Sequence, residues 1–182
     1  QLNVDGCFVL KMDIKNVFIN EDAHPVVEWD LDKASYPNYL FDKMLVYRKD
    51  PGGAYVQIGS QPDQNKNYYN DFQIDASLVD INAYEYKVEV LLNNTQMGKS
   101  NSITSILLNS SGNNCDSLEL TWNKYDGWAN PLYTVYLGVE DGAGGYTWKA
   151  QNTTPIADNK FTFQLDPSNE AGSYMLKVET ID

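Results

Sequence analysis

The side chains of this sequence that could carry acid–base chemistry are mostly carboxylates. Two close pairs stand out, Asp30 with Asp32 and Glu140 with Asp141, and paired carboxylates are the groups that hydrolyse glycosidic bonds. Both pairs fall at the ends of predicted strands or in turns, where Asp and Glu are ordinarily solvated surface residues. We therefore expect neither pair to be catalytic.

Nucleophilic and zinc chemistry would depend on one histidine and two cysteines. His24 stands directly before Pro25, at the start of a predicted strand, where a structural or solvent-exposed role is expected. Cys7 and Cys115 with this single imidazole do not supply the four ligands of a structural zinc site. We expect both thiols to be unpaired within this chain, and the alternative is that one pairs with a cysteine outside this sequence.

Calcium and nucleotide motifs are also incomplete. Asp30-Leu31-Asp32 is similar to the start of a calcium loop, but the sixth and twelfth positions hold Ser35 and Phe41 instead of glycine and glutamate. No Gly-Lys-Ser/Thr phosphate loop or dinucleotide fingerprint is present. The sequence therefore predicts a protein that is not an enzyme, with no catalytic residue, no metal and no cofactor.

Aromatic side chains are the stronger functional candidates. Five of them lie on a predicted loop and the adjoining strands of the second half of the chain: Tyr125, Trp128, Tyr133, Tyr146 and Trp148. Rings exposed side by side can stack on sugars or anchor a protein partner. The alternative is that Tyr125 and Trp128 fold the loop onto the end of the domain and cap its core.

The charge balance excludes some partners. The chain has 25 Asp and Glu against 13 Lys and Arg, a net charge of −12. Nucleic-acid binding requires clustered basic side chains, and docking on an anionic membrane requires the same.

No apolar run approaches the roughly 20 residues that span a bilayer. Because the chain begins at Gln1 without a leader, we expect a removed signal segment, a start within a larger protein, or both.

Short alternating runs dominate the local pattern. Tyr84 to Val90 and Ser117 to Trp122 alternate apolar and polar residues with period two, which indicates half-buried strands. Turns such as Asp50-Pro51-Gly52-Gly53 separate these runs. We expect strands near 13–20, 25–31, 41–48, 54–60, 66–74, 83–92 and 99–105, and then near 106–110, 117–123, 132–139, 146–152, 160–166 and 173–181.

The pattern occurs twice, which indicates one module used in tandem. Three landmarks recur in the same order: a tryptophan ending the second strand, a Val-Tyr pair before a Gly-rich turn, and a tyrosine opening a late strand. They are Trp29, Val46-Tyr47 and Tyr84 in the first half, and Trp122, Val135-Tyr136 and Tyr174 in the second. We expect both tryptophans to fill sandwich cores, and both late tyrosines to form tyrosine corners whose hydroxyls bond the nearby backbone.

The order of these landmarks resembles the fibronectin type III module over nearly the whole chain. The resemblance implies two immunoglobulin-like, all-β sandwiches in tandem. The elements Ser105-Ile106-Leu107-Leu108, Cys115 and Leu120 to Trp128 are similar to fibronectin-like repeats upstream of C-terminal sorting domains in surface proteins of gliding bacteria and their relatives. The turn 93–98 lacks the cysteine that such repeats often carry.

The expected domains are 1–105, with 1–12 as an extra N-terminal segment, and 106–182. The second has one predicted strand fewer than the first, since nothing remains to pair beside 173–181. We expect that domain to lack its last strand, by truncation, by leaving an edge bare, or with a strand donated from elsewhere. Residues 1–12, with Cys7-Phe8-Val9-Leu10 as their apolar part, are one candidate donor.

The resulting functional expectation is a non-catalytic structural and interaction module that spaces or presents parts of a surface or secreted protein. Its partners would be other domains of the same longer chain, surface proteins or glycans. The alternative is a carbohydrate-binding module, or an accessory domain of a glycan-degrading enzyme.

Overall fold

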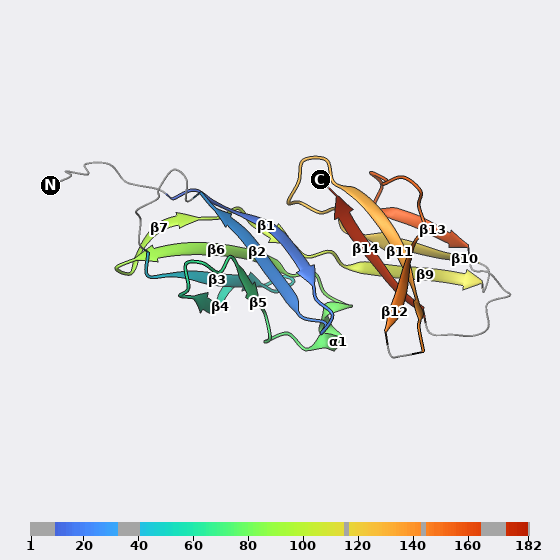
Figure 1. Cartoon of the computed structure of the whole chain (residues 1–182), viewed down its shortest axis with the longest axis horizontal. Coiled ribbons are helices and arrows are strands. Elements are labelled where there is room, and N and C mark those ends of the chain that lie inside the picture. The colour runs from blue at the N-terminus through green and yellow to red at the C-terminus, as the bar shows by residue number, and fades with distance from the viewer. Residues whose placement is uncertain (1–9, 33–40, 115–116, 143–144, 165–173, 182) are drawn as a thin grey trace. The chain divides into compact units, whose positions relative to one another are not determined.

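The computed structural model describes residues 10–32, 41–114, 117–142, 145–164 and 174–181. The chain divides into two compact units, Gln1–Ser105 and Ile106–Asp182, and both are built from antiparallel strands (Figure 1). No helix in the described ranges is long and apolar enough to cross a membrane.

The first unit pairs a three-stranded sheet with a five-stranded one. The three-stranded sheet has the order β1-β2-β5, and the other has the order β4-β3-β6-β7 with β8 also beside β6. The strands are β1 (Met12–Ile19), β2 (Pro25–Leu31), β3 (Lys43–Lys49), β4 (Tyr55–Gln61), β5 (Tyr68–Asn70), β6 (Glu85–Leu92), β7 (Thr95–Lys99) and β8 (Ile103–Thr104). One short helix, α1 (Ala76–Val79), precedes β6.

The core of the first unit follows from the period-two pattern. Tyr86, Val88 and Val90 alternate along β6 and are fully buried, while the residues between them are half-buried. Among the described residues, Trp29 on β2 is the largest side chain that is fully buried. Tyr84, directly before β6, is buried, and its hydroxyl donates to the Leu78 carbonyl at 3.5 Å, the arrangement of a tyrosine corner.

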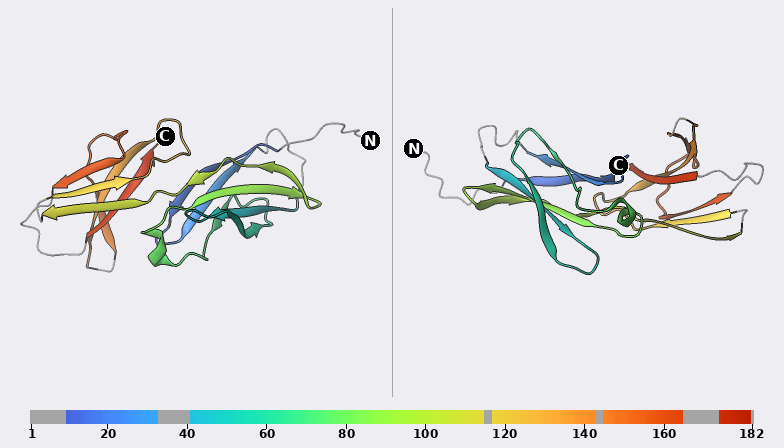
Figure 2. Two further views of the ribbon diagram at one scale, coloured as in Figure 1. Left: turned by 180° about the vertical axis from the view of Figure 1, so that it is seen from behind. Right: turned by 90° about the horizontal axis from the view of Figure 1, so that it is seen from below.

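The second unit pairs two three-stranded sheets (Figure 2). One has the order β13-β10-β9 and the other the order β12-β11-β14. The strands are β9 (Leu108–Asn114), β10 (Ser117–Trp122), β11 (Leu132–Glu140), β12 (Tyr146–Ala150), β13 (Lys160–Gln164) and β14 (Tyr174–Ile181). Trp122 is buried at the end of β10, as Trp29 is buried in β2.

The predicted fold class is confirmed as an all-β tandem of two antiparallel sandwiches. The second unit also has the shorter sheet that the sequence indicated. Among the described residues β14 pairs with β11 alone, whereas β6 pairs with β3 on one side and with β7 and β8 on the other.

Several predicted boundaries were wrong: the strand expected near 66–74 is confined to Tyr68–Asn70, and the one expected near 99–105 to Ile103–Thr104. The turn expected over 93–98 is a two-residue hairpin, because Asn93 and Asn94 both adopt positive φ, 51° and 61°, as a type I′ turn requires. Residues 95–99 are therefore strand β7. The first strand of the second unit does not end at 110 but continues to Asn114.

Residues 10–12 do not form an extra segment outside the first sandwich. The Leu10 N–H donates to the Met97 carbonyl at 2.7 Å, Lys11 accepts from the Asp32 N–H at 3.2 Å, and Met12 begins β1. This backbone pairing engages them within the first unit, so they are not available as donors to the second. Residues 1–9, both cysteines (Cys7 and Cys115) and the side chain of Tyr174 lie outside what the structure describes.

Candidate functional site

The five aromatic side chains proposed as contacts do not form one surface. Tyr125 and Tyr133 are fully buried. The Tyr133 hydroxyl accepts a hydrogen bond from the Tyr125 N–H at 2.9 Å, and the Tyr133 ring packs edge-on against Trp122, with centroids 5.3 Å apart. The expectation of a contact role was wrong for Tyr125 and Tyr133, because tertiary packing places their rings inside the core.

Trp128 has a different environment from the rings on β12. It is half-buried, and its ring meets that of Tyr125 edge to face with a centroid distance of 5.1 Å. Since Tyr125 is anchored in the core, this contact holds the 123–131 loop against the end of the sandwich. That geometry corresponds to the capping alternative for Tyr125 and Trp128.

Tyr146 and Trp148 are the two aromatic candidates that reach solvent. They lie two residues apart on β12 and therefore on the same face. Their side chains are 36% and 37% exposed, and their ring centroids are 6.0 Å apart at an interplanar angle of 42°. Every residue of β12 is exposed, so both faces of this strand reach solvent.

The sheet register shows which neighbours share this face. Trp148 is paired with Gly138 of β11, and Tyr146 is paired with Glu140. Tyr136, two residues before Gly138, is paired with Lys177 of β14. Because directly paired residues point to the same side of a sheet, these side chains lie on the outer face, opposite the buried Tyr133 and Val135.

Gly138 gives Trp148 its position. A Cβ at Gly138 would lie 2.9, 3.0 and 3.1 Å from Cζ3, Cε3 and Cη2 of the indole. Near-equal distances to three consecutive ring carbons place that point over the face of the six-membered ring and not at its edge. The indole therefore lies flat against the backbone of β11, which only a residue without a side chain allows.

Lys177 joins the rings of the outer face. Its Nζ is 5.0 Å from the Tyr136 ring centroid and 4.7 Å from that of Trp148, within the range of cation–π attraction. The same Nζ is 2.6 Å from Glu179 Oε1. Burial raises the pKa of the Tyr136 hydroxyl, and the Glu179 carboxylate beside it raises that pKa further. We call Tyr136, Tyr146, Trp148 and Lys177 the outer aromatic face.

The first unit carries the same arrangement at equivalent positions. Lys87 Nζ lies 4.7 Å from the Tyr47 ring centroid and 4.8 Å from that of Tyr55, and 2.9 Å from Glu89. Burial and Glu89 together raise the Tyr47 pKa. The pair is more enclosed here, since the Lys87 and Glu89 side chains are 26% and 15% exposed, against 38% and 47% for Lys177 and Glu179.

A polar network lies inside the first unit. The fully buried Asp71 carboxylate accepts from Arg48 Nη1 at 2.8 Å and from the Tyr86 hydroxyl at 3.0 Å, both on Oδ2. Its Oδ1 accepts from the Gln73 N–H at 3.1 Å. Burial, and to a smaller extent the Asp71 charge, raise the Tyr86 pKa above its ordinary value. This network ties β3, β6 and the segment after β5 together, and its carboxylate has no access to a ligand.

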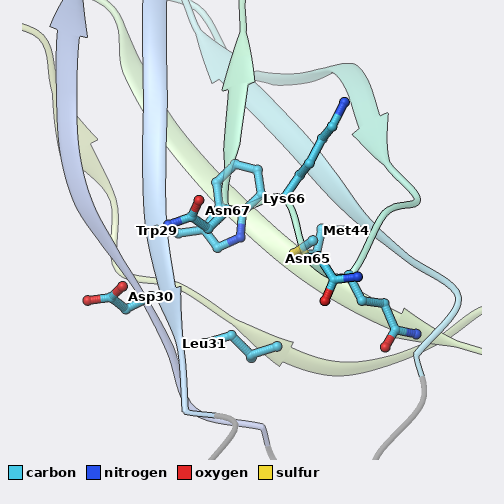
Figure 3. Close-up of a pocket in the computed structure, with 8 residues that line it drawn as sticks. Trp29, Asp30, Leu31, Met44, Asn65, Lys66 and Asn67 are labelled. Carbon is cyan, nitrogen blue, oxygen red and sulfur yellow. The ribbon is translucent and has the colours of Figure 1, made fainter.

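One cavity of about 290 Å³ lies beside Trp29 (Figure 3). Trp29 and Met44 contribute almost no exposed surface to it, because both are fully buried. The remaining lining is mainly polar: Asp30, Gln64, Asn65, Lys66 and Asn67, with Leu31. The cavity therefore offers hydrogen-bonding groups but no accessible aromatic ring.

The residues considered for catalysis or metal binding are spread over separate loops and strand ends. His24 is half-buried and packs its ring edge-on against Phe72 at 5.2 Å. Asp30 is exposed, and Asp141 accepts from the Gly145 N–H at 3.0 Å within a turn. Within the described ranges, no three His, Cys, Asp or Glu side chains are grouped so that they could hold a metal ion.

Comparison with known proteins yields structural likeness only. No protein family and no curated protein matches this chain. Among solved structures, it is similar to the chicken CNTN1 FN1–FN3 domains, at 12% identity and a TM-score of 0.45, over 96% of this chain and 62% of that one. It is also similar to a segment of two fibronectin type III domains from chicken tenascin, at 12% identity and a TM-score of 0.36, over 94% and 89% of the two chains.

This chain thus spans 62% of the CNTN1 structure. At this identity and these TM-scores the likeness carries no information on ligands or partners. The fold rests on the strand pairing of the chain itself: two antiparallel sandwiches, each with a tryptophan from its second strand in the core.

Proposed function

We propose that this chain is a non-catalytic interaction module of a secreted or cell-surface protein, and that its second unit makes contact through the outer aromatic face. The observation that carries the proposal is the exposure of Trp148 and Tyr146, each above one third, on a strand held in a packed sheet. Trp and Tyr are enriched among the residues that dominate binding energy at protein interfaces.

The electrostatics of this face favour binding over chemistry. Lys177 is engaged by Glu179 and by two rings. A cation held in this way orients the rings around it. The face therefore offers ring surface and a Lys177–Glu179 ion pair within a chain of net charge −12.

The spacer and adhesion roles belong to the same proposal. Each unit has its own buried core around its own tryptophan, which is the construction of a module that can be placed between others. The partners we propose are surface proteins and other domains of the same longer chain.

The test compares Trp148→Ala and Tyr146→Ala with Val139→Ala. Val139 is a matched control because it is 47% exposed on β11 of the same sheet but lies on the opposite face. Each protein would be titrated against purified extracellular proteins by biolayer interferometry. A hot-spot ring costs about 2 kcal/mol or more when truncated, so we expect Trp148→Ala to weaken binding about 30-fold or more and Val139→Ala to have little effect. Equal weakening of binding by Trp148→Ala and by Val139→Ala would contradict the proposal.

A second candidate function is carbohydrate binding, favoured by the flat placement of the Trp148 indole over Gly138. An aromatic ring held parallel to the surface can stack on the apolar face of a sugar. Binding to a glycan array that is lost in Trp148→Ala, with an unchanged thermal midpoint, would favour this function over a protein partner. Retention of glycan binding in Trp148→Ala would exclude it.

A further inference from the structure

The three-stranded sheet of the first unit has an outer face with a defined set of side chains. Figure 1 shows its strands β1 and β2, in blue, in front of β3 and β6. Val27 and Trp29 of β2 are fully buried, so the residues between and beside them point outward, because side chains alternate along a strand. Directly paired residues share a side, and the register places two rows on the outer face: Phe18–Val26–Asn70 and Asn16–Glu28–Tyr68.

Three aromatic side chains of this face reach solvent. Phe18 is 38% exposed and Tyr68 is 39% exposed. Phe72, just beyond the end of β5, is 67% exposed, and its ring meets that of His24 edge-on with centroids 5.2 Å apart. Val26 is only 5% exposed although it points outward. The side chains around Val26 therefore form a continuous apolar layer over it.

The backbone on either side of Phe72 is held by buried contacts. The Asp71 carboxylate accepts from Arg48 Nη1 at 2.8 Å and is fully buried. Gln73 Nε2 donates to the Ile58 carbonyl at 2.7 Å. A ring presented on a fixed backbone loses little conformational freedom when a partner binds. The exposed ring of Phe72 thus belongs to a surface that is organised before any contact is made.

The charges around these rings are almost all negative. Residues 12–31 contain five acidic residues and one basic residue, Lys15. Glu28 lies among the rings, and in the next row Asp13 is paired directly with Asp30, although like charges opposite each other destabilise a sheet. Among the described residues none of these three carboxylates belongs to an ion pair. The face therefore combines exposed rings with carboxylates that have no counter-charge there.

We propose that this surface, which we call the acidic aromatic face (Phe18, Glu28, Tyr68 and Phe72), binds an arginine-bearing segment of a partner protein. A guanidinium can stack on a ring and pair with a carboxylate, and Tyr68 is paired directly with Glu28. Apolar side chains of the same segment would lie on Phe18 and Phe72. The site belongs to the first unit and not to the outer aromatic face, so it goes beyond the function proposed above.

The charges disfavour a second copy of this chain as the occupant. In a dimer with a two-fold axis the same patch meets itself, so Glu28, Asp13 and Asp30 would approach their own copies. An anionic membrane surface would meet the same repulsion. A partner that carries arginine neutralises these carboxylates, and such complementarity of charge steers association and selects partners.

The experiment titrates the full chain against two labelled peptides of equal length, one alternating arginine with leucine and the other alternating glutamate with leucine. Fluorescence anisotropy should show saturable binding of the arginine peptide and none of the glutamate peptide. Phe72→Ala should weaken binding of the arginine peptide about fivefold or more, as truncation of a contributing interface residue does. Tyr68→Ala should weaken it about two- to fivefold, the range of an exposed cation–π contact.

Matched variants separate this site from the general acidity of the chain. Val56→Ala removes a side chain that is 64% exposed on β4 of the other sheet, and Asp158→Asn removes an exposed carboxylate of the second unit. Both variants should bind the arginine peptide normally. Glu28→Gln should weaken binding up to about fivefold and make it less sensitive to salt. Phe72→Tyr keeps the ring and should bind nearly as the unchanged chain does, which controls for misfolding.

Four results would overturn the proposal. One is the absence of saturable binding of the arginine peptide at up to about 1 mM. Another is equal weakening by Phe72→Ala and Val56→Ala, or equal binding of the two peptides. A third is protection of Phe72 and Tyr68 from hydroxyl-radical labelling in the chain without peptide, which would show that the face is already covered. The last is binding of uncharged phosphatidylcholine vesicles that is lost in Phe72→Ala, which would assign the face to a lipid surface.

Discussion

Adding one methyl group at Gly138 tests whether the sheet backbone holds the exposed indole of Trp148 flat. The φ angle of Gly138 is not among the positive values of the chain, so alanine fits the backbone conformation. The new Cβ would lie 2.9–3.1 Å from three carbons of the indole, which is closer than carbon atoms approach. The ring must therefore lift away from β11, and with it the contact to Lys177 must change.

The expected change in the unfolding free energy of the second unit results from two opposing effects. Overpacking typically costs about 1–3 kcal/mol, and the lower end applies because Trp148 is 37% exposed and its ring can shift. Alanine in a strand also gains about 0.5–1 kcal/mol relative to glycine. We expect Gly138→Ala to destabilise the second unit by about 1 kcal/mol. In a Trp148→Ala background the clash is gone, and the same substitution should stabilise the unit by about 0.5–1 kcal/mol.

The assay is a double-mutant cycle from urea unfolding of the four proteins, with the second transition assigned by hydrogen exchange. The change of sign between the two backgrounds is the diagnostic result, because a pure backbone effect of glycine would be the same in both. Acrylamide quenching of tryptophan fluorescence should also increase in Gly138→Ala. If Gly138→Ala stabilised both backgrounds equally, the flat indole would not be packed on the sheet as described.

Two further predictions concern the first unit. Asp71→Ala should lower the free energy of urea unfolding by about 3–5 kcal/mol, because it leaves the mostly buried Arg48 without its counter-charge. Asp50→Ala, at the exposed end of the same guanidinium, should lower it by less than about 1 kcal/mol. Equal losses in the two variants would refute the role of the buried carboxylate. The hydrogen bond from Lys49 holds the Glu85 pKa below its ordinary value. The ionised Glu85 therefore stabilises the folded unit fully above the unfolded glutamate pKa of about 4.3. This stabilisation is lost as the pH falls through the lowered pKa of the folded state. Glu85→Gln should therefore lower the urea midpoint at pH 7 and have a smaller effect at pH 3, and an equal decrease at both pH values would contradict the assignment.

The strands could be predicted from the sequence because their pattern is local. The alternation from Tyr84 to Val90 places every second side chain on one face whatever the rest of the chain does. The observed strand β6 starts and ends within two residues of the predicted one. The short helix at Ala76–Val79 was not predicted, since four residues are too few to show a helical period. The hairpin at Asn93 and Asn94 was missed because two asparagines in positive φ replace the glycine that usually marks such a turn.

The candidate site could be predicted only in part. Trp148 and Tyr146 are two residues apart on a strand, so their common face follows from the sequence. Tyr125 follows a strand and could point either way, and only the packing of the loop on the sandwich shows that its ring is buried. No sequence pattern marks Gly138 as the support of an indole, because the two residues meet only through the pairing of β11 with β12.

The amino-acid sequence alone determined the all-β character of this protein, the two repeats of one sandwich pattern and the tryptophan at each centre, because alternation and turn chemistry act between near neighbours. Only the tertiary structure decided which aromatic rings reach solvent and which lysine lies between them. Those properties depend on which strands pair and in what register, and pairing joins residues that are far apart in the chain.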